Sequence, residues 1–175
     1  MKIIEDLLKK DTDTLSEHES KLILAEYGVP ITREYVVGSE KEAVSAAAEI
    51  GFPVVLKGSG KGLRHKTELN LISLGMRDEK SVREAYRKLI SHQGQEVREV
   101  LVQQMIGGER ELLVGFTRDR QFGPCVMFGL GGIYTEILKD FTFRIAPLSR
   151  RDALDMMEDI RGREILNAFR GKQPV

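Results

Sequence analysis

The opening of the chain carries the hydrophobic pattern of two amphipathic helices. A serine followed three residues later by glutamate, the spacing of a capping box, occurs at Ser16 and again at Ser39. Apolar residues then recur at helical spacing until a glycine closes each segment, Gly28 in the first case and Gly51 in the second. The pattern therefore predicts one helix before each of these glycines.

Short apolar runs rich in β-branched residues separate these helices and continue beyond them. Residues 34–37 and 53–57 have the composition of strands, so the chain opens in the order helix, strand, helix, strand. Strands are also predicted over 69–74 and 97–106, with a helix over 81–90 between them.

The pattern changes from about residue 97, where apolar runs follow one another across glycine turns at 107–108 and 123–124. The later elements predicted are strands over 111–117 and 125–128, a half-buried strand pair within 136–144, and helices over 151–158 and 163–169. Runs of antiparallel strands after helix–strand units are typical of an α+β fold, and we expect two small lobes with a cleft between them.

Composition narrows the classes of function. The 175 residues include 27 basic and 27 acidic side chains, a balance that argues against a protein that coats nucleic acid or an anionic membrane. The longest uncharged stretch, 121–135, is shorter than the roughly 20 residues that span a bilayer, and charges within 1–10 interrupt any secretory signal. The single cysteine, Cys125, excludes an intrachain disulfide, so we expect a cytoplasmic protein and a core role for Cys125.

The most unusual segment is the basic loop 57–66, which follows the predicted strand 53–57. It combines four permanent positive charges with three glycines and no acid. Glycines allow backbone N–H groups to approach an anion and lysines add charge, so a polyphosphate is the expected ligand. The spacing matches neither the Walker motif nor the dinucleotide fingerprint, and a solvated surface loop explains the same residues equally well.

His65 lies inside this basic loop. Neighbouring cations favour its neutral imidazole, which is the form that attacks phosphorus. A second glycine cluster occupies 128–133, but Tyr134 stands where a Rossmann phosphate turn needs glycine, and a bulge or a tight strand crossing also explains these glycines. The spacing of histidine and cysteine is not that of a metal site.

Several longer stretches together resemble one family. They are Leu15 to Glu17, Ala25 to Pro30, Pro53 to Lys57, His65–Lys66, Val102 to Met105 before Glu111, Gln121 to Ile133, Glu136 to Asp140 and Phe143 to Leu148. In these stretches the chain is similar to the ATP-grasp subunit of NDP-forming acyl-CoA synthetases. This subunit is the β subunit or fused β domain of the ADP-forming acetyl-CoA synthetases, which are related to succinyl-CoA synthetase.

The resemblance implies an α+β, ATP-grasp fold in which ATP or ADP binds in a cleft between two α+β lobes. It implies an N-terminal extension over 1–14, a first lobe over 15–96 and a second lobe over 97–175 that is incomplete at its C-terminal end. His65 is implied as the catalytic residue that relays a phosphoryl group. The residues implied for the nucleotide are Lys57 for phosphate, with Gly58, Gly60 and Lys66 of the basic loop, Gln103, Gln104, Met105 and Ile106 for adenine, Glu111 for ribose and phosphates, and Gly131 and Gly132 in the second lobe.

In the family as a whole, acyl-CoA, ADP and phosphate are converted to the free acid, CoA and ATP. The resemblance implies a CoA-binding α subunit or fused α domain that carries a phosphohistidine, and Mg²⁺ held by residues that in the family lie beyond the position of Val175. We expect an exposed sheet edge there, covered by a partner chain or within a homo-oligomer.

Two functions stay open at this point. The chain is either the nucleotide-binding, phosphoryl-relaying part of such a synthetase or a truncated, non-catalytic ATP-grasp module for nucleotide binding or protein interaction. Nothing in the residues identifies the acyl acid or decides whether the chain is active alone.

Overall fold

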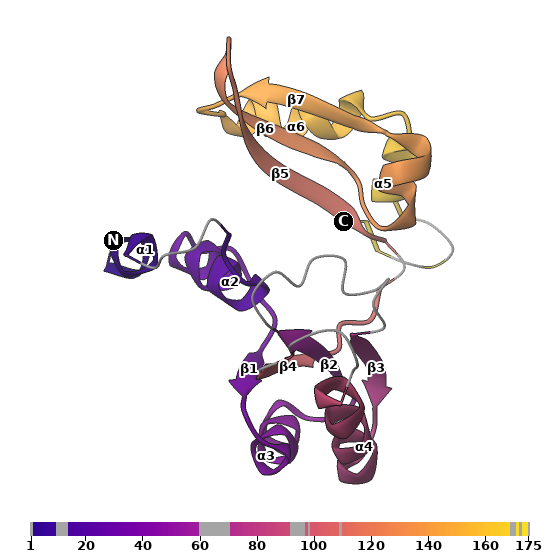
Figure 1. Cartoon of the computed structure of the whole chain (residues 1–175). Coiled ribbons are helices and arrows are strands. Elements are labelled where there is room, and N and C mark those ends of the chain that lie inside the picture. The colour runs from indigo at the N-terminus through magenta and orange to yellow at the C-terminus, as the bar shows by residue number, and fades with distance from the viewer. Residues whose placement is uncertain are drawn as a thin grey trace. The chain divides into compact units, whose positions relative to one another are not determined.

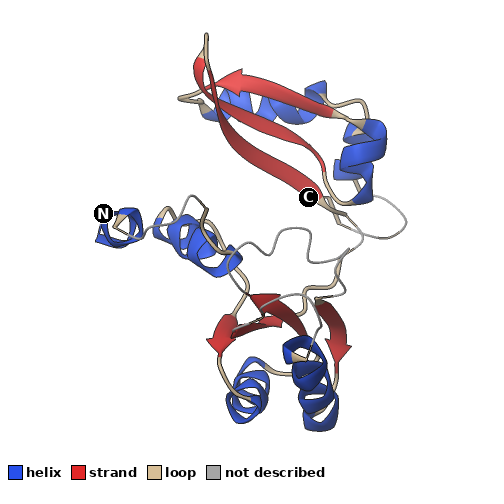
Figure 2. Ribbon diagram, viewed as in Figure 1, coloured by secondary structure: helices blue, strands red, loops and turns tan. Residues whose placement is uncertain are grey.

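A computed structural model describes residues 2–9, 14–59, 71–91, 97, 99–108, 110–168, 171 and 173–174. The chain divides into two compact units, Met1–Ile106 and Gly107–Val175, drawn in Figures 1 and 2. Each unit has one antiparallel sheet and its own hydrophobic core. This combination of helices and antiparallel sheets confirms the predicted α+β class.

The sheet of the first unit has four strands, in the order β1 (Glu34–Val37), β4 (Glu99–Gln104), β2 (Val54–Ser59) and β3 (Ile72–Met76). All neighbouring strands pair antiparallel. Strand β4 comes last in the sequence of this unit yet lies between β1 and β2. The four predicted strands are confirmed within a few residues, except that residues 69 and 70 of the predicted strand 69–74 lie outside the described residues.

Helices α3 (Glu40–Ile50) and α4 (Glu79–Ile90) cover one face of this sheet, as Figure 1 shows. The buried side chains of α4 follow the spacing of a single helical face, and they are Val82, Ala85, Tyr86 and Leu89. They pack in one core with alternate strand residues, including Val54, Leu56, Val100 and Val102. Because successive strand residues point to opposite faces, the residues between them project away from the two helices.

Helix α2 (Glu17–Glu26) starts at the predicted capping box. The Ser16 hydroxyl accepts a hydrogen bond from the Glu19 N–H at 3.2 Å, and the Glu19 carboxylate accepts one from the Ser16 N–H at 2.8 Å. Both helices predicted at the start of the chain are therefore confirmed. Helix α1 (Lys2–Leu8) is an element that the sequence pattern did not predict.

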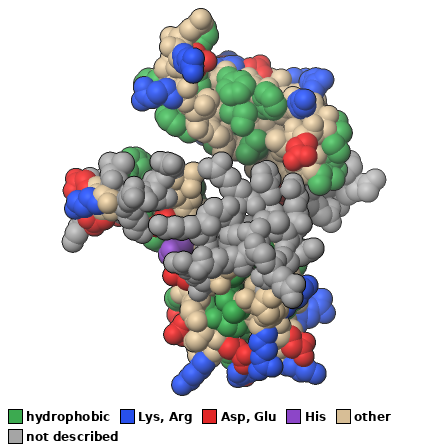
Figure 3. All heavy atoms as spheres, viewed as in Figure 1, with side chains coloured by type: hydrophobic (Ala, Val, Ile, Leu, Met, Phe, Trp, Pro, Cys, Tyr) green, Lys and Arg blue, Asp and Glu red, His purple; other side chains and the backbone are tan. Residues whose placement is uncertain are grey.

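The second unit has a three-stranded antiparallel sheet, in the order β5 (Leu112–Asp119), β6 (Gly123–Leu130) and β7 (Phe141–Ile145). Helix α6 (Arg150–Asp159) and the short 3₁₀ helix η1 (Arg163–Leu166) form a smaller core with it around Leu130 and Ile160. Large hydrophobic side chains such as Val114 stay exposed in this unit, where Figure 3 shows hydrophobic surface.

The strand pair predicted within 136–144 is wrong in its first half, because helix α5 (Ile133–Leu138) occupies that segment. Gly132, with a φ of 59°, turns the backbone out of β6, and its carbonyl accepts a hydrogen bond from the Thr135 N–H at 3.1 Å. The alternation of apolar and polar residues corresponds to a strand only from Phe141 onward.

The division into units differs from the predicted lobe boundary between residues 96 and 97. Strand β4 is hydrogen-bonded to β1 and β2, so it belongs to the first unit, and the structure divides after Ile106. The N-terminal extension over 1–14 stays a prediction. Among the helices in the described part of the chain, none has both the length and the apolar composition needed to cross a membrane.

Candidate nucleotide site

One face of the first sheet carries polar side chains opposite the face that carries the core. Gln103 on β4 pairs with Glu34 on β1 and with Val55 on β2, and paired residues of antiparallel strands project to the same face. Lys57 is two residues from Val55 and so shares that face, whereas the intervening Leu56 belongs to the core. Two predicted site residues, Lys57 and Gln103, therefore point to the side of the sheet that α3 and α4 leave open.

The Lys57 ammonium is held by the first residue of α2. Its Nζ donates a hydrogen bond to Glu17 Oε1 at 2.6 Å, and the Lys57 side chain is 19% exposed. An ammonium has three N–H donors, and among the described residues only Glu17 accepts one of them. Two donors of Lys57 thus remain for a ligand.

The Glu17 carboxyl responds to two opposing influences. Burial raises its pKa. The hydrogen bonds from Lys57 and Lys21 and the positive charges of these lysines lower the pKa by more than burial raises it, so the pKa of Glu17 lies below its ordinary value. Glu17 is therefore a carboxylate at neutral pH, and it forms charge-assisted hydrogen bonds with both lysines.

Lys21, one turn along α2, extends this polar network. Its Nζ donates to Glu17 Oε1 at 3.0 Å, to Thr32 Oγ1 at 3.1 Å and to Glu34 Oε2 at 2.7 Å. Glu34 has a side chain only 2% exposed, and its other oxygen lies 2.9 Å from His18 Nδ1. A buried carboxylate is stable only with partners of this kind, so Lys21 and His18 support Glu34.

The side chain of Gln103 belongs to the same network. Its Nε2 donates to Thr32 Oγ1 at 2.7 Å and to Glu34 Oε2 at 3.2 Å. The chain then leaves β4 through Met105 and Ile106, whose side chains are exposed. In the segment predicted to contact adenine, the Gln103 side chain is thus held by hydrogen bonds, whereas the Met105 and Ile106 side chains are exposed to solvent.

Two other predicted residues use their backbone groups within the first unit. The Gly58 N–H donates to the Leu71 carbonyl at 2.8 Å, and the Gln104 N–H donates to the Arg33 carbonyl at 2.8 Å. A Cβ at Gly58 would lie 3.3 Å from Val97 Cγ2. Any contribution of Gly58 to anion binding therefore comes from its small size and not from its own N–H.

In the second unit, the structure brings Glu111 together with both predicted glycines. The Gly131 N–H donates to the Glu111 carbonyl at 2.7 Å, and a Cβ at Gly131 would lie 2.8 Å from the Glu111 carbonyl carbon. A Cβ at Gly132 would lie 2.6 Å from Glu111 Oε2. The glycines permit this close approach, and the Glu111 carboxylate lies beside Gly132.

The remaining predicted site residues, Gly60, His65 and Lys66, lie outside the described residues. Within the described ranges no group of three or more histidine, cysteine, aspartate or glutamate side chains could hold a metal ion. The described side chains therefore do not form a metal centre, and the magnesium implied by the resemblance stays a prediction.

Sequence reasoning missed the residues that support Lys57 and Gln103. Glu17 and Lys21 are four residues apart in a helix that was predicted, and this spacing places them on one face. Their contacts with Lys57 and Glu34 join segments that are far apart in the sequence, which only the tertiary fold reveals.

Asp140, which falls within the strand pair predicted over 136–144, is buried. Its carboxylate accepts the Arg161 N–H at 2.8 Å and the Gly162 N–H at 2.7 Å. Burial raises the pKa of Asp140, but these two N–H groups and the Arg161 guanidinium more than offset it, so the pKa lies below its ordinary value. Asp140 thus ties the start of β7 to the turn after α6.

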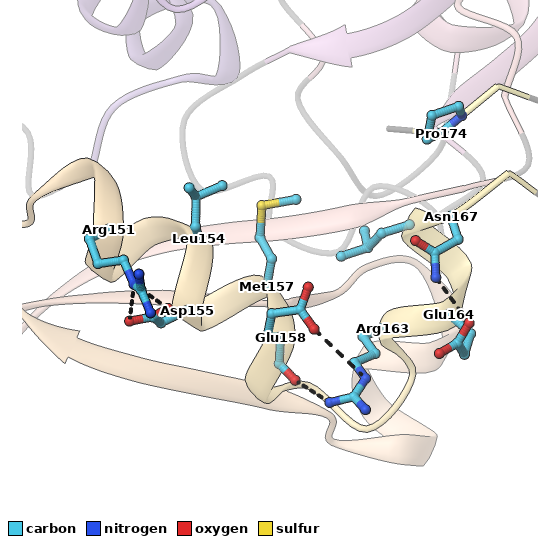
Figure 4. Close-up of a pocket in the computed structure, with 10 residues that line it drawn as sticks. Arg151, Leu154, Asp155, Met157, Glu158, Arg163, Glu164, Asn167 and Pro174 are labelled. Atoms are coloured by element: carbon cyan, nitrogen blue, oxygen red, sulfur yellow. Dashed lines mark hydrogen bonds and ion pairs between the residues drawn. The ribbon is translucent and has the colours of Figure 1, made fainter.

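A separate pocket of about 420 Å³ lies on the second unit, beside α6 and η1. Figure 4 shows the residues that line it. Four of its charged residues form two ion pairs, Arg151 with Asp155 and Arg163 with Glu158. The Glu164 carboxylate accepts a hydrogen bond from Asn167 Nδ2 at 3.0 Å. Among the described residues, none of the predicted site residues lines this pocket.

Comparisons with known proteins converge on one family. The ATP-grasp domain family matches residues 6–175. The chain is 40% identical over 172 residues to the β subunit of acetate–CoA ligase [ADP-forming] I from Pyrococcus furiosus, covering 95% of this chain and 74% of that subunit. It is also 40% identical over 156 residues to acetate–CoA ligase [ADP-forming] II from Archaeoglobus fulgidus, covering 89% of this chain but 23% of that longer protein.

The fold comparison gives the same result. Acetyl-coenzyme A synthetase 1 of Ca. Korarchaeum cryptofilum, in complex with coenzyme A and Ca-AMPCP, matches with a TM-score of 0.94 and 39% identity, covering 99% of this chain and 78% of that chain. A second structure of that protein contains Mg-AMPPCP, with a phosphohistidine segment pointing towards the nucleotide-binding site. It matches with a TM-score of 0.85 and 38% identity, covering 99% and 76% of the two chains.

Proposed function

Since this chain belongs to the ATP-grasp domain family, we propose that it is the nucleotide-binding, phosphoryl-relaying part of an ADP-forming acyl-CoA synthetase. The complete reaction converts acyl-CoA, ADP and phosphate to the acid, CoA and ATP. The observation that carries this proposal is the 40% identity to a β subunit of such a ligase over 95% of the chain. The polar face of the first sheet supports it, because Lys57 and Gln103 both lie there. Lys57 has one acceptor among the described residues, and Gln103 is followed by the exposed residues Met105 and Ile106.

Lys57 binds phosphate oxygens with its two remaining N–H donors, aided by the basic loop that contains Gly60 and Lys66. The segment from Gln103 through Ile106 offers backbone groups to adenine. Phosphoryl transfer depends mainly on positioning and on neutralising negative charge, and a lysine fixed by a carboxylate provides both. In the second unit Glu111, with its two glycine neighbours, contributes to the binding of ribose and phosphates.

His65 relays the phosphoryl group. A ring nitrogen of its neutral imidazole forms a bond to phosphorus as the bond between phosphorus and the partner's histidine breaks. A terminal phosphate oxygen of ADP then attacks that phosphorus, and the bond to His65 breaks as ATP forms. Bound Mg²⁺ would neutralise phosphate charge in this reaction, but the described residues supply no cluster to hold it.

The partner in this proposal is a CoA-binding subunit or a fused CoA-binding domain. Two relatives support it, since one is named as a β subunit and the other is a longer single protein of which this chain covers about a quarter. The partner would form the acyl phosphate and present its phosphohistidine to this chain.

The test is phosphorylation of the chain mixed with its partner and Mg·ATP. An acid-labile phosphate should appear on the wild-type chain and be absent in His65→Ala, while His92→Ala serves as the matched histidine control. A thermal-shift titration with ADP tests binding by itself, because a ligand at 100 times its Kd adds about 2.7 kcal/mol of stability. A shift without phosphorylation would indicate a binding module instead, and the absence of both would refute the proposal.

A further inference from the structure

A continuous series of contacts joins the two ends of the proposed nucleotide site. Lys57 contacts Glu17, Glu17 contacts Lys21, Lys21 contacts Glu34, and Glu34 contacts Gln103, at distances from 2.6 to 3.2 Å. Lys57 belongs to the phosphate end and Gln103 to the adenine end. Lys21 is the residue in the middle, and it contacts the carboxylates on both sides.

The two lysines differ in what they can offer a ligand. Lys21 uses its three N–H donors on three acceptors, Glu17, Thr32 and Glu34. Lys57 has one acceptor among the described residues, Glu17. A phosphate oxygen can therefore reach Lys57 without breaking a contact, whereas Lys21 would have to release a partner first.

Burial makes the contacts of Lys21 consequential. Glu34 is 2% exposed, so it cannot exchange Lys21 for water, and Lys21 itself is only 19% exposed. Both lysines donate to the same oxygen of Glu17, which keeps their two ammonium groups close to each other. Loss of the Lys21 charge would remove the Lys21 ammonium from both Glu34 and Glu17, which are the two carboxylates that it joins.

We propose that Lys21 is a positioning residue that sets the phosphate and adenine ends of the nucleotide site together. It acts through Glu17, which orients the Lys57 ammonium, and through Glu34, which orients the Gln103 amide. This inference rests on the proposed function, because it assumes that Lys57 and Gln103 lie at the two ends of one bound nucleotide.

The first experiment divides the ligand into its two halves. Calorimetric titrations with ADP, tripolyphosphate and adenosine compare the wild-type chain with Lys21→Met and Glu17→Gln. We expect Lys21→Met to weaken ADP binding at least tenfold and to weaken both tripolyphosphate and adenosine, because both ends lose their support. Glu17→Gln should weaken tripolyphosphate binding more than adenosine binding, because Glu17 contacts Lys57 directly and reaches Gln103 only through Lys21 and Glu34.

Lys41→Met is the matched control, since Lys41 is an exposed lysine on α3 away from this network. It should bind all three ligands like the wild-type chain. If the wild-type chain binds ADP and Lys21→Met binds it within twofold, the positioning role is overturned while the proposed function stands. If the wild-type chain binds neither ADP nor tripolyphosphate, the proposed function fails, and this inference fails with it.

A double-mutant cycle separates positioning from general stability. Glu17 and Gln103 are joined through Lys21 and Glu34, so the effects of Glu17→Gln and Gln103→Met on ADP affinity should be coupled. We expect the double variant to differ at least fivefold from the product of the single effects, and the coupling to disappear when Lys21→Met is added. The cycle in the wild-type background tests the positioning role of Lys21 even if Lys21→Met does not fold. If the ADP affinity of the double variant lies within twofold of the product of the two single effects, that role is overturned.

Discussion

The backbone N–H of Gly131 donates to the carbonyl of Glu111 at 2.7 Å, so the end of β6 is fastened to the residue that precedes β5. Both residues were predicted to belong to the nucleotide site from separate stretches of the sequence. Their contact means that the position of the Glu111 carboxylate depends on how closely the glycine backbone can approach. Packing against Glu111 therefore requires glycine at position 131, independently of any contact with a ligand.

Gly131→Ala should destabilise the second unit by about 1–3 kcal/mol, because its Cβ would lie 2.8 Å from a backbone carbon that cannot move aside easily. Urea unfolding measures this change. Gly108→Ala is the matched control, since its Cβ would meet nothing within 4 Å and its backbone has no positive φ. Equal stability of the two variants would contradict the packing argument.

Lys57→Met should weaken the binding of ADP by about ten- to a hundredfold, since a hydrogen bond to a charged group contributes about 1.5–3 kcal/mol. Calorimetric titration gives the affinity. Lys88→Met on α4 removes an exposed lysine and should leave ADP binding unchanged. An affinity of Lys57→Met equal to that of Lys88→Met would remove Lys57 from the site.

Local sequence patterns were sufficient to predict the helices and strands whose formation depends on residues close together in the chain. The serine and glutamate spacing at Ser16 predicted α2, because a capping box lies within one turn of the helix that it starts. The boundary predicted at 96–97 differs from the structural division after Ile106, because the pairing of β4 with β1 and β2 is set across the whole unit. Helix α5 was missed because its six residues are too few for a periodic pattern to distinguish it from a strand.

The site residues also differ in whether the sequence could predict them. Lys57, Gln103 and Glu111 came from resemblance to a family, which carries information on function that local propensity lacks. Glu17 and Lys21 support Lys57 from a segment 40 and 36 residues earlier in the chain. No local pattern gives such a contact, since it depends on how α2 packs against the sheet.

Asp140→Asn should reduce the stability of the second unit at neutral pH by about 2 kcal/mol, because two backbone N–H groups lose a charged acceptor. The pKa of Asp140 is lowered in the folded chain, so its contribution is present above its unfolded pKa of about 3.9 and is lost as pH falls through the folded value. Unfolding at pH 7 and below pH 3 should therefore show a difference between wild type and variant that shrinks in acid.

Asp155→Asn is the control for that measurement. Asp155 is half exposed and pairs with Arg151 one turn earlier on α6, an arrangement that contributes about 0.5 kcal/mol or less. A loss at Asp155 as large as that at Asp140 would show that the effect comes from removing a negative charge and not from the buried contacts of Asp140.

Glu17→Gln tests the network of the first unit in the same way. The folded pKa of Glu17 is lowered by Lys57 and Lys21 against the opposing effect of burial, so folding favours its charged form. Its stabilisation is therefore present above the unfolded pKa of about 4.3 and is lost as pH falls through the folded value. We expect Glu17→Gln to reduce the free energy of unfolding by about 1 kcal/mol at pH 7 and by much less near pH 3, measured by urea unfolding.

Glu84→Gln is the control, since Glu84 is an exposed acid on α4, and it should reduce the free energy of unfolding by less than half as much at pH 7. A cost for Glu17→Gln that stays constant across this pH range would mean that its charged contacts with the two lysines contribute no stability.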